Sequence, residues 1–157
     1  MKRSLIALAL VAACIGPASA QSSVLPASGQ AFLKKAIVAG EQEVADAKAH
    51  TSDPNSSVRY FANRMIADHT KADRKLIGLA QQDHVMLPNP PGPGPAMSGA
   101  QYMHAQLLAH EQAVALFSKE AQDGSGAVRS LAAQILPTLQ QHLAMAQQFA
   151  KTGKISM

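Results

Sequence analysis

The stretch LPNPPGPGPAMSG, residues 87–99, decides how the rest of the chain can be arranged. Proline cannot donate a backbone hydrogen bond, so a segment this rich in proline forms neither the inside of a helix nor a central strand. We interpret it as an extended, partly polyproline connection. A connection of about sixteen residues, at about 3 Å per residue, is long enough to run the whole length of a helical bundle.

Four segments around this connection have apolar residues at alternating steps of three and four, which is the spacing of one helix face. Asp53-Pro54 gives an N-cap followed by proline, and Ser98 with Gln101 gives a capping box, two usual signals of a helix start. Ser28 is the expected N-cap of the first helix. We therefore predict helices over about residues 29–51, 54–83, 99–122 and 126–151.

The composition also indicates an all-α protein. Apolar residues make up 47% of the chain, yet it has only four Phe, two Tyr and no Trp, which suits closely packed helices better than a sheet. Four helices with one apolar face each are expected to close into a four-helix bundle over residues 28–151, with tails at residues 21–27 and 152–157. The long connection permits a ferritin-like crossover between the second and third helices, with an up-down-up-down arrangement as the alternative.

Residues 1–20 have the pattern of a signal peptide. Lys2 and Arg3 precede a short apolar run, and Ala18-Ser19-Ala20 forms an A-x-A cleavage site. We expect cleavage after Ala20 and export to the periplasm; the alternative is a lipoprotein signal with Cys14 lipidated. With cleavage after Ala20 the mature chain has no cysteine, so disulfides and thiolate metal ligands are excluded.

The charge pattern does not indicate a nucleic-acid partner or a membrane span. The chain has 14 Lys and Arg against 10 Asp and Glu, and the charges outside the signal peptide are interspersed. Nucleic-acid-binding domains instead concentrate basic residues on one surface. The apolar run of the signal peptide is too short to cross a bilayer.

Three histidines, His69, His110 and His142, occupy positions on the predicted apolar faces. Each lies about twelve to sixteen residues from the nearest hairpin turn, so all three are expected in the middle third of the bundle. The two hairpins resemble each other in sequence, and in that alignment Gly40 is the counterpart of His110, with Glu43 about one turn further on. A buried imidazole needs partners for its nitrogens, and converging histidines with a carboxylate form a metal-ligand set.

The predicted metal ligands are therefore Glu43, His69, His110 and His142. A di-iron bundle would need a glutamate three residues before two of its histidines, but apolar residues occupy those positions here. This histidine-rich set suits one zinc, copper, nickel or iron ion better than an oxygen-activating iron pair. The alternative is that the histidines are purely structural.

Other polar and soft side chains are expected to have structural or solvated roles. Asp68 and Glu111 adjoin histidines and should point about 100° away from them. The methionines on the apolar faces should fill the core, with Cu(I) ligation as the alternative, namely Met65, Met103 and Met145. Histidines near helix ends should be exposed, namely His50, His84 and His104. Charged residues on the outer faces should be solvated, namely Glu41, Lys71, Asp73 and Arg74.

The sequence contains no pattern typical of a catalytic nucleophile. Its serines cluster at turns and caps, and no G-x-S-x-G motif occurs. The glycines of residues 87–99 alternate with prolines, which cannot supply the backbone N–H groups of a phosphate-binding loop. We therefore expect no enzymatic activity.

Four segments in combination resemble the exported ferritin-like domains of unknown function found in many Gram-negative bacteria, which are often labelled outer-membrane proteins. They are FLKKAIVAGEQEV, FANRMIADHTKADRKL, YMHAQLLAHEQAVALF and LPTLQQHLAMAQQFA. The resemblance covers about residues 28–151 and implies a four-helix bundle with the ferritin-like crossover. It implies no reaction, and it adds outer-membrane association as an option. It also marks five polar positions, namely Glu43, Asp68, His69, His110 and His142.

Three functions follow as hypotheses. The first is a periplasmic bundle that stores, buffers or senses a metal through the predicted ligands. The second is a non-catalytic envelope protein with structural histidines and a protein partner. The third, a ferritin-type redox enzyme, is disfavoured because the carboxylates are missing.

Overall fold

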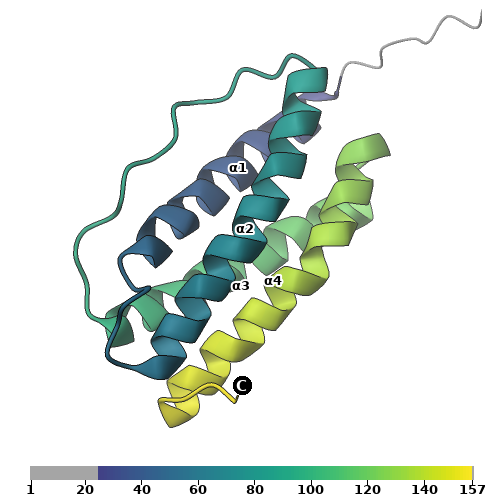
Figure 1. Cartoon of the computed structure of the whole chain (residues 1–157). Helices are drawn as coiled ribbons and strands as arrows, with labels where there is room; N and C mark the ends of the chain where they lie inside the picture. The colour runs from purple at the N-terminus through teal and green to yellow at the C-terminus, as the bar shows by residue number, and fades with distance from the viewer. Residues whose placement is uncertain (1–24, 157) are drawn as a thin grey trace, which may run out of the picture.

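The computed structural model describes residues 25–156, which form four α-helices (Figure 1). Their bounds are α1 Ala27–Lys48, α2 Ser56–Gln82, α3 Gly99–Asp123 and α4 Gly126–Thr152. The described part of the chain contains no strand, so the predicted all-α four-helix bundle is confirmed. The predicted signal peptide and Cys14 lie outside the described residues.

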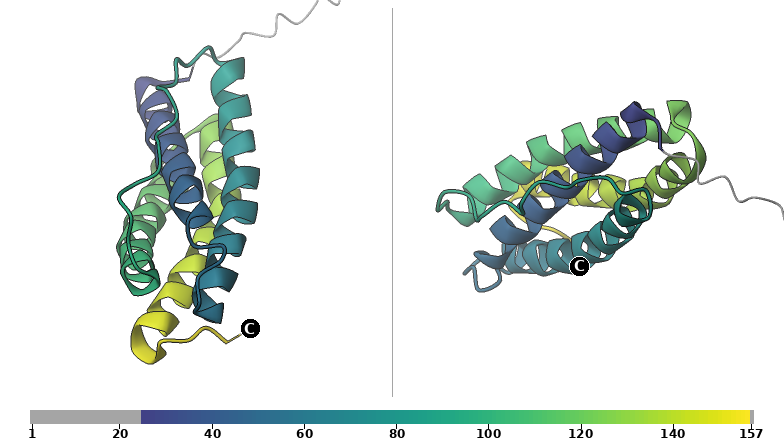
Figure 2. Two further views of the ribbon diagram at one scale, coloured as in Figure 1. Left: turned by 60° about the vertical axis from the view of Figure 1, so that its left-hand side comes forward. Right: turned by 90° about the horizontal axis from the view of Figure 1, so that it is seen from above.

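The helices have the ferritin-like arrangement. α1 packs antiparallel on α2, and α3 packs antiparallel on α4 (Figures 1 and 2). Between the two hairpins, residues 83–98 run back along the outside of the bundle, so that α3 starts at the end where α2 started (Figure 1). α2 and α3 are therefore parallel and lie diagonally opposite each other, and the up-down-up-down alternative is wrong.

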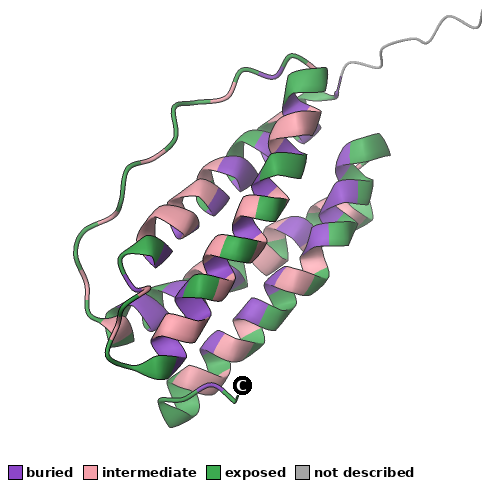
Figure 3. Cartoon of the chain, in the orientation of Figure 1, coloured by how far each residue is buried: buried purple, intermediate pink, exposed green. Residues whose placement is uncertain are grey.

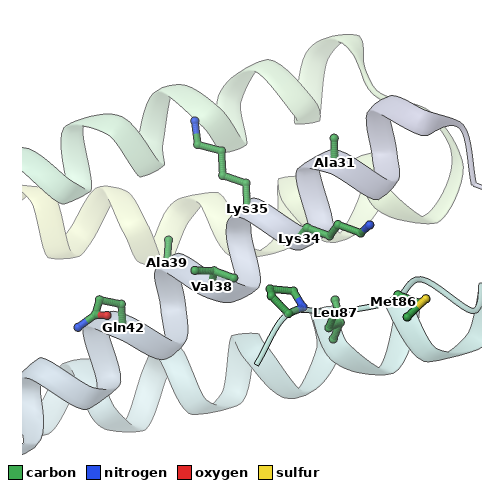
Figure 4. A pocket seen from close by; sticks show the side chains of 9 residues that line it. Ala31, Lys34, Lys35, Val38, Ala39, Gln42, Met86 and Leu87 are labelled. Carbon is green, nitrogen blue, oxygen red and sulfur yellow. The ribbon is translucent and has the colours of Figure 1, made fainter. Parts of the chain in front are cut away.

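The crossover follows α1 and is attached to it. The backbone N–H of Gly94 donates a hydrogen bond to Asp46 Oδ1 over 2.8 Å. Further up α1, Leu87 and the largely exposed Met86 line one side of an open groove, while Val38 and Lys34 line the other (Figure 4). The proline-rich segment therefore forms an ordered cover over one side of the first hairpin.

Local hydrogen bonds explain where the helices begin. Ser98 and Gln101 form the predicted capping box of α3. α2 is capped by Asn55, whose side chain accepts hydrogen bonds from the backbone N–H groups of Ser57 and Val58. The predicted cap at Asp53 is wrong because that carboxylate accepts from the backbone N–H of Asn55 instead. α1 starts after Pro26, so the predicted cap at Ser28 is also wrong.

Two apolar clusters fill the bundle, and the inward sides of all four helices are buried (Figure 3). One cluster contains Leu33, Ile37 and Leu139, and the other contains Phe61 and Met65. Met103 is buried in the second cluster and Met145 packs against it, so all three methionines take part in the core packing expected of them. A layer of polar side chains separates the two clusters.

The prediction of an exposed His50 is wrong. His50 is only 5% exposed, and its imidazole ring stacks on the ring of Tyr102, with the ring centroids 4.2 Å apart. Because α1 ends at Lys48, the chain turns early and His50 lies against the first turns of α3. His84 and His104 are exposed as expected.

Among the helices formed by residues 27–152, none combines the length and the apolar character needed to cross a membrane.

Replacing Leu33, which is 0% exposed, by alanine is expected to lower the free energy of unfolding by about 2–5 kcal/mol, because it leaves a cavity in the core. The matched change Leu108→Ala, at a position 47% exposed, should alter it by less than about 0.5 kcal/mol. Urea unfolding followed by circular dichroism measures both. Equal losses in the two variants would contradict the core described above.

Candidate metal centre

Three helices bring three imidazole rings together in the polar layer. His69 comes from α2, His110 from α3 and His142 from α4, and all three are buried. One ring nitrogen from each lies within 4.8 Å of the others. The ring centroids are 5.3 to 5.6 Å apart. The structure therefore brings together the three histidines that were selected from sequence.

Each imidazole has a carboxylate or carbonyl oxygen close to one of its ring nitrogens. His69 Nδ1 lies 3.1 Å from Glu43 Oε2, and His142 Nε2 lies 3.0 Å from Asp68 Oδ2. His110 Nδ1 lies 2.9 Å from the backbone carbonyl oxygen of Gln106. A carbonyl oxygen can only accept, so His110 Nδ1 carries the proton and Nε2 presents its lone pair.

The other nitrogen of each ring is buried and has no hydrogen-bond partner within residues 25–156. These atoms are His69 Nε2, His110 Nε2 and His142 Nδ1. Buried polar atoms are normally satisfied, so three neighbouring exceptions call for a physical explanation. An imidazole whose outer nitrogen is bound by a carboxylate or carbonyl, and whose inner nitrogen is free, has the orientation found in histidine metal ligands.

The site is close to neutral at neutral pH. Burial, together with the smaller effect of the Asp73 and Asp46 charges, raises the pKa of Glu43 from 4.5 to about 8. Burial lowers the pKa of His69 well below 6.5, and the neighbouring histidines add to the effect. Burial also lowers the pKa of His110 to about 4. The imidazoles are therefore in the uncharged form that binds metals.

Asp68 has a different role from the one predicted. Asp68 was expected to point away from the histidines. It does point away from its sequence neighbour His69, but its carboxylate contacts His142 on the adjacent helix α4. The same oxygen, Oδ2, accepts a hydrogen bond from Arg64 Nε over 2.8 Å. Although partial burial acts to raise the pKa of Asp68, the hydrogen bonds from Arg64 and His142 lower it overall. An ionised Asp68 therefore orients His142.

The prediction of a solvated Asp73 is also wrong. Asp73 is 7% exposed, and its carboxylate lies against Gly40 of α1. A Cβ atom at Gly40 would collide with Asp73 Oδ1, so the space left by this glycine admits the aspartate. Burial raises the pKa of Asp73 to about 7, with a further contribution from Glu41.

Comparison with known proteins places the chain in a family. The family model described as "Domain of unknown function (DUF4142)" matches residues 15–98 and 97–149. The protein belongs to this family. A search of curated protein sequences found no match to it.

One solved structure resembles this DUF4142 domain closely in fold. It is the crystal structure of a DUF305 fragment from Deinococcus radiodurans, with a TM-score of 0.65 and 15% sequence identity. The match covers 79% of this chain and 95% of that chain. At this identity the likeness supports the helical arrangement and carries no information about the site.

The sequence predicted the three histidines of this DUF4142 site but missed some of the groups that contact them from behind. Gln106 was missed because it contributes a backbone carbonyl, which any residue type could supply. Its position four residues before His110 on one helix is the only signal in the sequence. Asp68 was marked by the family resemblance, although the reason for its position is a contact with another helix.

The metal-free domain is expected to lose stability as the pH rises from about 7 to about 8.5. In this range folded Glu43, with a pKa of about 8, keeps a proton that the unfolded chain, with a pKa of 4.5, has released. Raising the pH therefore favours unfolding, by about 1 kcal/mol over this range. Asp73, with a pKa of about 7, adds a smaller loss in the same direction. The buried histidines add little, because above pH 7 they are mostly neutral in both states.

Urea unfolding at a series of pH values, with a chelator present, measures this slope. Glu43→Gln should flatten it, because the amide does not titrate. Glu111→Gln, at an exposed position of α3, is the matched control and should keep it. An unchanged slope in Glu43→Gln would refute the assignment.

Proposed function

We propose that this DUF4142 domain binds one transition-metal ion at the centre of the bundle through His69, His110 and His142. The observation that carries the proposal is the set of three neighbouring ring nitrogens without hydrogen-bond partners, each on a ring whose other nitrogen lies within 3.1 Å of a carboxylate or carbonyl oxygen. A buried histidine with a purely structural role is expected to have both ring nitrogens hydrogen-bonded. It has no reason to direct an unpaired nitrogen at two further imidazoles.

The distances suit a metal after a small adjustment. Zinc–nitrogen bonds are about 2.0–2.1 Å long, which sets ligand nitrogens about 3.4 Å apart. The observed nitrogens lie within 4.8 Å of one another, so side-chain movements of about 1 Å would close the site around an ion. Three neutral imidazoles suit zinc, copper or nickel better than a pair of iron ions, which prefers carboxylates.

Glu43, the fourth ligand predicted from sequence, is better assigned as an orienting residue. Its Oε2 is 3.1 Å from His69 Nδ1, the nitrogen on the outer side of that ring, and 3.9 Å from His110 Nε2. When a metal takes His69 Nε2, His69 Nδ1 carries the proton and donates it in a hydrogen bond to the Glu43 carboxylate. Because Glu43 is protonated in the metal-free site at pH 7, metal binding releases a proton.

We further infer binding, storage or buffering rather than catalysis. The cavity that adjoins Glu43 and His69 has a volume of about 30 Å³, enough for about one water molecule but not for an organic substrate. The expected signal peptide would place this activity in the periplasm.

The alternative hypothesis, an envelope protein with structural histidines, draws on the open groove between α1 and the crossover (Figure 4). Its walls include Val38 and Leu87, with Lys34 and Lys35 at the edge, so it suits an acidic amphipathic segment of a partner protein. The two hypotheses differ in whether the histidines bind metal, and the titration below separates them.

The chelator-treated domain is expected to bind one zinc or copper ion per chain in isothermal titration calorimetry. The double variant His110→Ala/His142→Ala should lose this binding, because two of the three ligands are gone. His104→Ala, at an exposed position of the same helix α3, is the matched control and should bind normally. Equal binding by the double variant and the wild type, or no binding by the wild type, would sink the metal hypothesis.

Asp68→Asn is expected to weaken metal binding by about 10–100-fold without removing a ligand. Asparagine keeps the shape of the side chain but loses the charge that favours an oriented His142. The measurement is a competition titration against a chelator of known affinity, with Asp123→Asn as the control, since Asp123 is exposed at the end of α3. An affinity unchanged from the wild type would show that Asp68 does not act on the site.

A further inference from the structure

Two cavities meet at Asp73, one outside the bundle and one inside it. The outer cavity, of about 320 Å³, lies between α1 and α2 beneath the crossover, where Pro90 and Pro91 cover it. Two acidic and two basic residues line it, namely Glu41, Asp73, Lys48 and Arg74. The inner cavity, of about 30 Å³, is lined by Gly40, Glu43 and His69. Asp73 is the one residue that lines both. Its side chain is therefore the wall between solvent and the histidine cluster.

Asp73 can occupy this position because the residue of α1 opposite it, Gly40, has no side chain. Gly40 lets the Asp73 carboxylate pack against the backbone of α1, where any Cβ atom would collide with it. Asp73 is 7% exposed, yet no side chain or backbone N–H within residues 25–156 donates a hydrogen bond to it or pairs with it. Because Asp73 lines the outer cavity, water or a cation in that cavity can contact its carboxylate.

The inner cavity adjoins the histidine cluster at His69, which is 5% exposed. His69 Nε2 has no hydrogen-bond partner among the described residues. Glu43 lines the same cavity and contacts the other nitrogen of His69. A cation that passes Asp73 therefore meets the carboxylate and the imidazole in succession.

The opposite side of α2 is less suited to cations. A cavity of about 130 Å³ there is lined by Asp68, Lys71 and Lys75. The Asp68 carboxylate is already bound by Arg64 and His142, so the two lysines of this cavity have no unpaired carboxylate beside them. In the outer cavity, Glu41 and Asp73 balance the charges of Lys48 and Arg74. The cavity beside Asp68 shares only the apolar residues Ala72 and Ile135 with the inner one, so passage would have to part the core.

We propose that Asp73 is the entry gate of the metal site, a transient ligand that takes a divalent cation from the outer cavity and passes it to His69. The gate rests on the proposed metal-binding function and adds to it a route and a residue outside the ligand set. A carboxylate can replace part of the hydration shell of the ion, and it moves aside without disturbing a hydrogen bond to the protein.

The rate of metal loading tests the gate, measured by stopped-flow absorbance with Co²⁺ as the coloured probe and the chelator-treated full domain. Asp73→Asn is expected to load about tenfold more slowly, because the amide attracts cations less strongly. Its equilibrium affinity for Co²⁺ should fall by less than its loading rate. Glu111→Gln removes one negative charge from an exposed position of α3 and should load like the wild type.

A second variant blocks the route without touching a polar group. Ala45 lines the outer cavity but not the inner one, so Ala45→Phe should slow loading and release by the same factor and leave the affinity unchanged. Ala31→Phe places the same ring in the separate groove beside the crossover and is the control.

The outcomes separate the two proposals. If the wild type binds no Co²⁺ at equilibrium, both the proposed metal binding and the proposed gate are refuted. If the wild type binds but Asp73→Asn and Ala45→Phe load at its rate, the gate alone is overturned. Slower loading in both variants, with both controls unaffected, supports it.

Discussion

The burial of three imidazole rings in the middle of the bundle is the constraint on which the rest of the structure depends. A buried ring nitrogen needs a hydrogen-bond partner, and here each ring finds one partner that fixes its orientation. Glu43 of α1 holds His69 of α2, and Asp68 of α2 holds His142 of α4. The polar layer therefore ties helices together in one register, with apolar clusters packed on both sides.

This arrangement supports the proposal that the site binds a metal rather than turns over a substrate. The ligand nitrogens lie deep in the bundle, the adjoining cavity is small, and Phe61 closes the layer with its ring edge-on to His110 and His142. Burial keeps the imidazoles uncharged and Glu43 protonated, so the metal-free layer avoids the cost of isolated charges in the core. The uncharged imidazoles also keep nitrogen lone pairs, which a metal ion needs.

The crossover and the polar layer meet at one place in the fold. Gly40 opens α1 at the height of the layer, Asp73 fills the opening, and the crossover passes outside it. The proline-rich segment resists helix formation and is held to α1 through Gly94 and Asp46. A segment that the fold needs only as a long connection therefore also lines the outer cavity beside Asp73.

Much of this protein followed from the sequence by itself, because helix periodicity and capping are local. The four helices, the capping box at Ser98 and the inward position of His69, His110 and His142 needed only the spacing of residues along one helix. The tertiary structure decided which residues of other helices contact each helix face. Asp68 reaches His142, Asp73 packs against Gly40, and His50 stacks on Tyr102, because helix rotation and register bring distant segments together. Sequence spacing along one helix carries no information on those contacts.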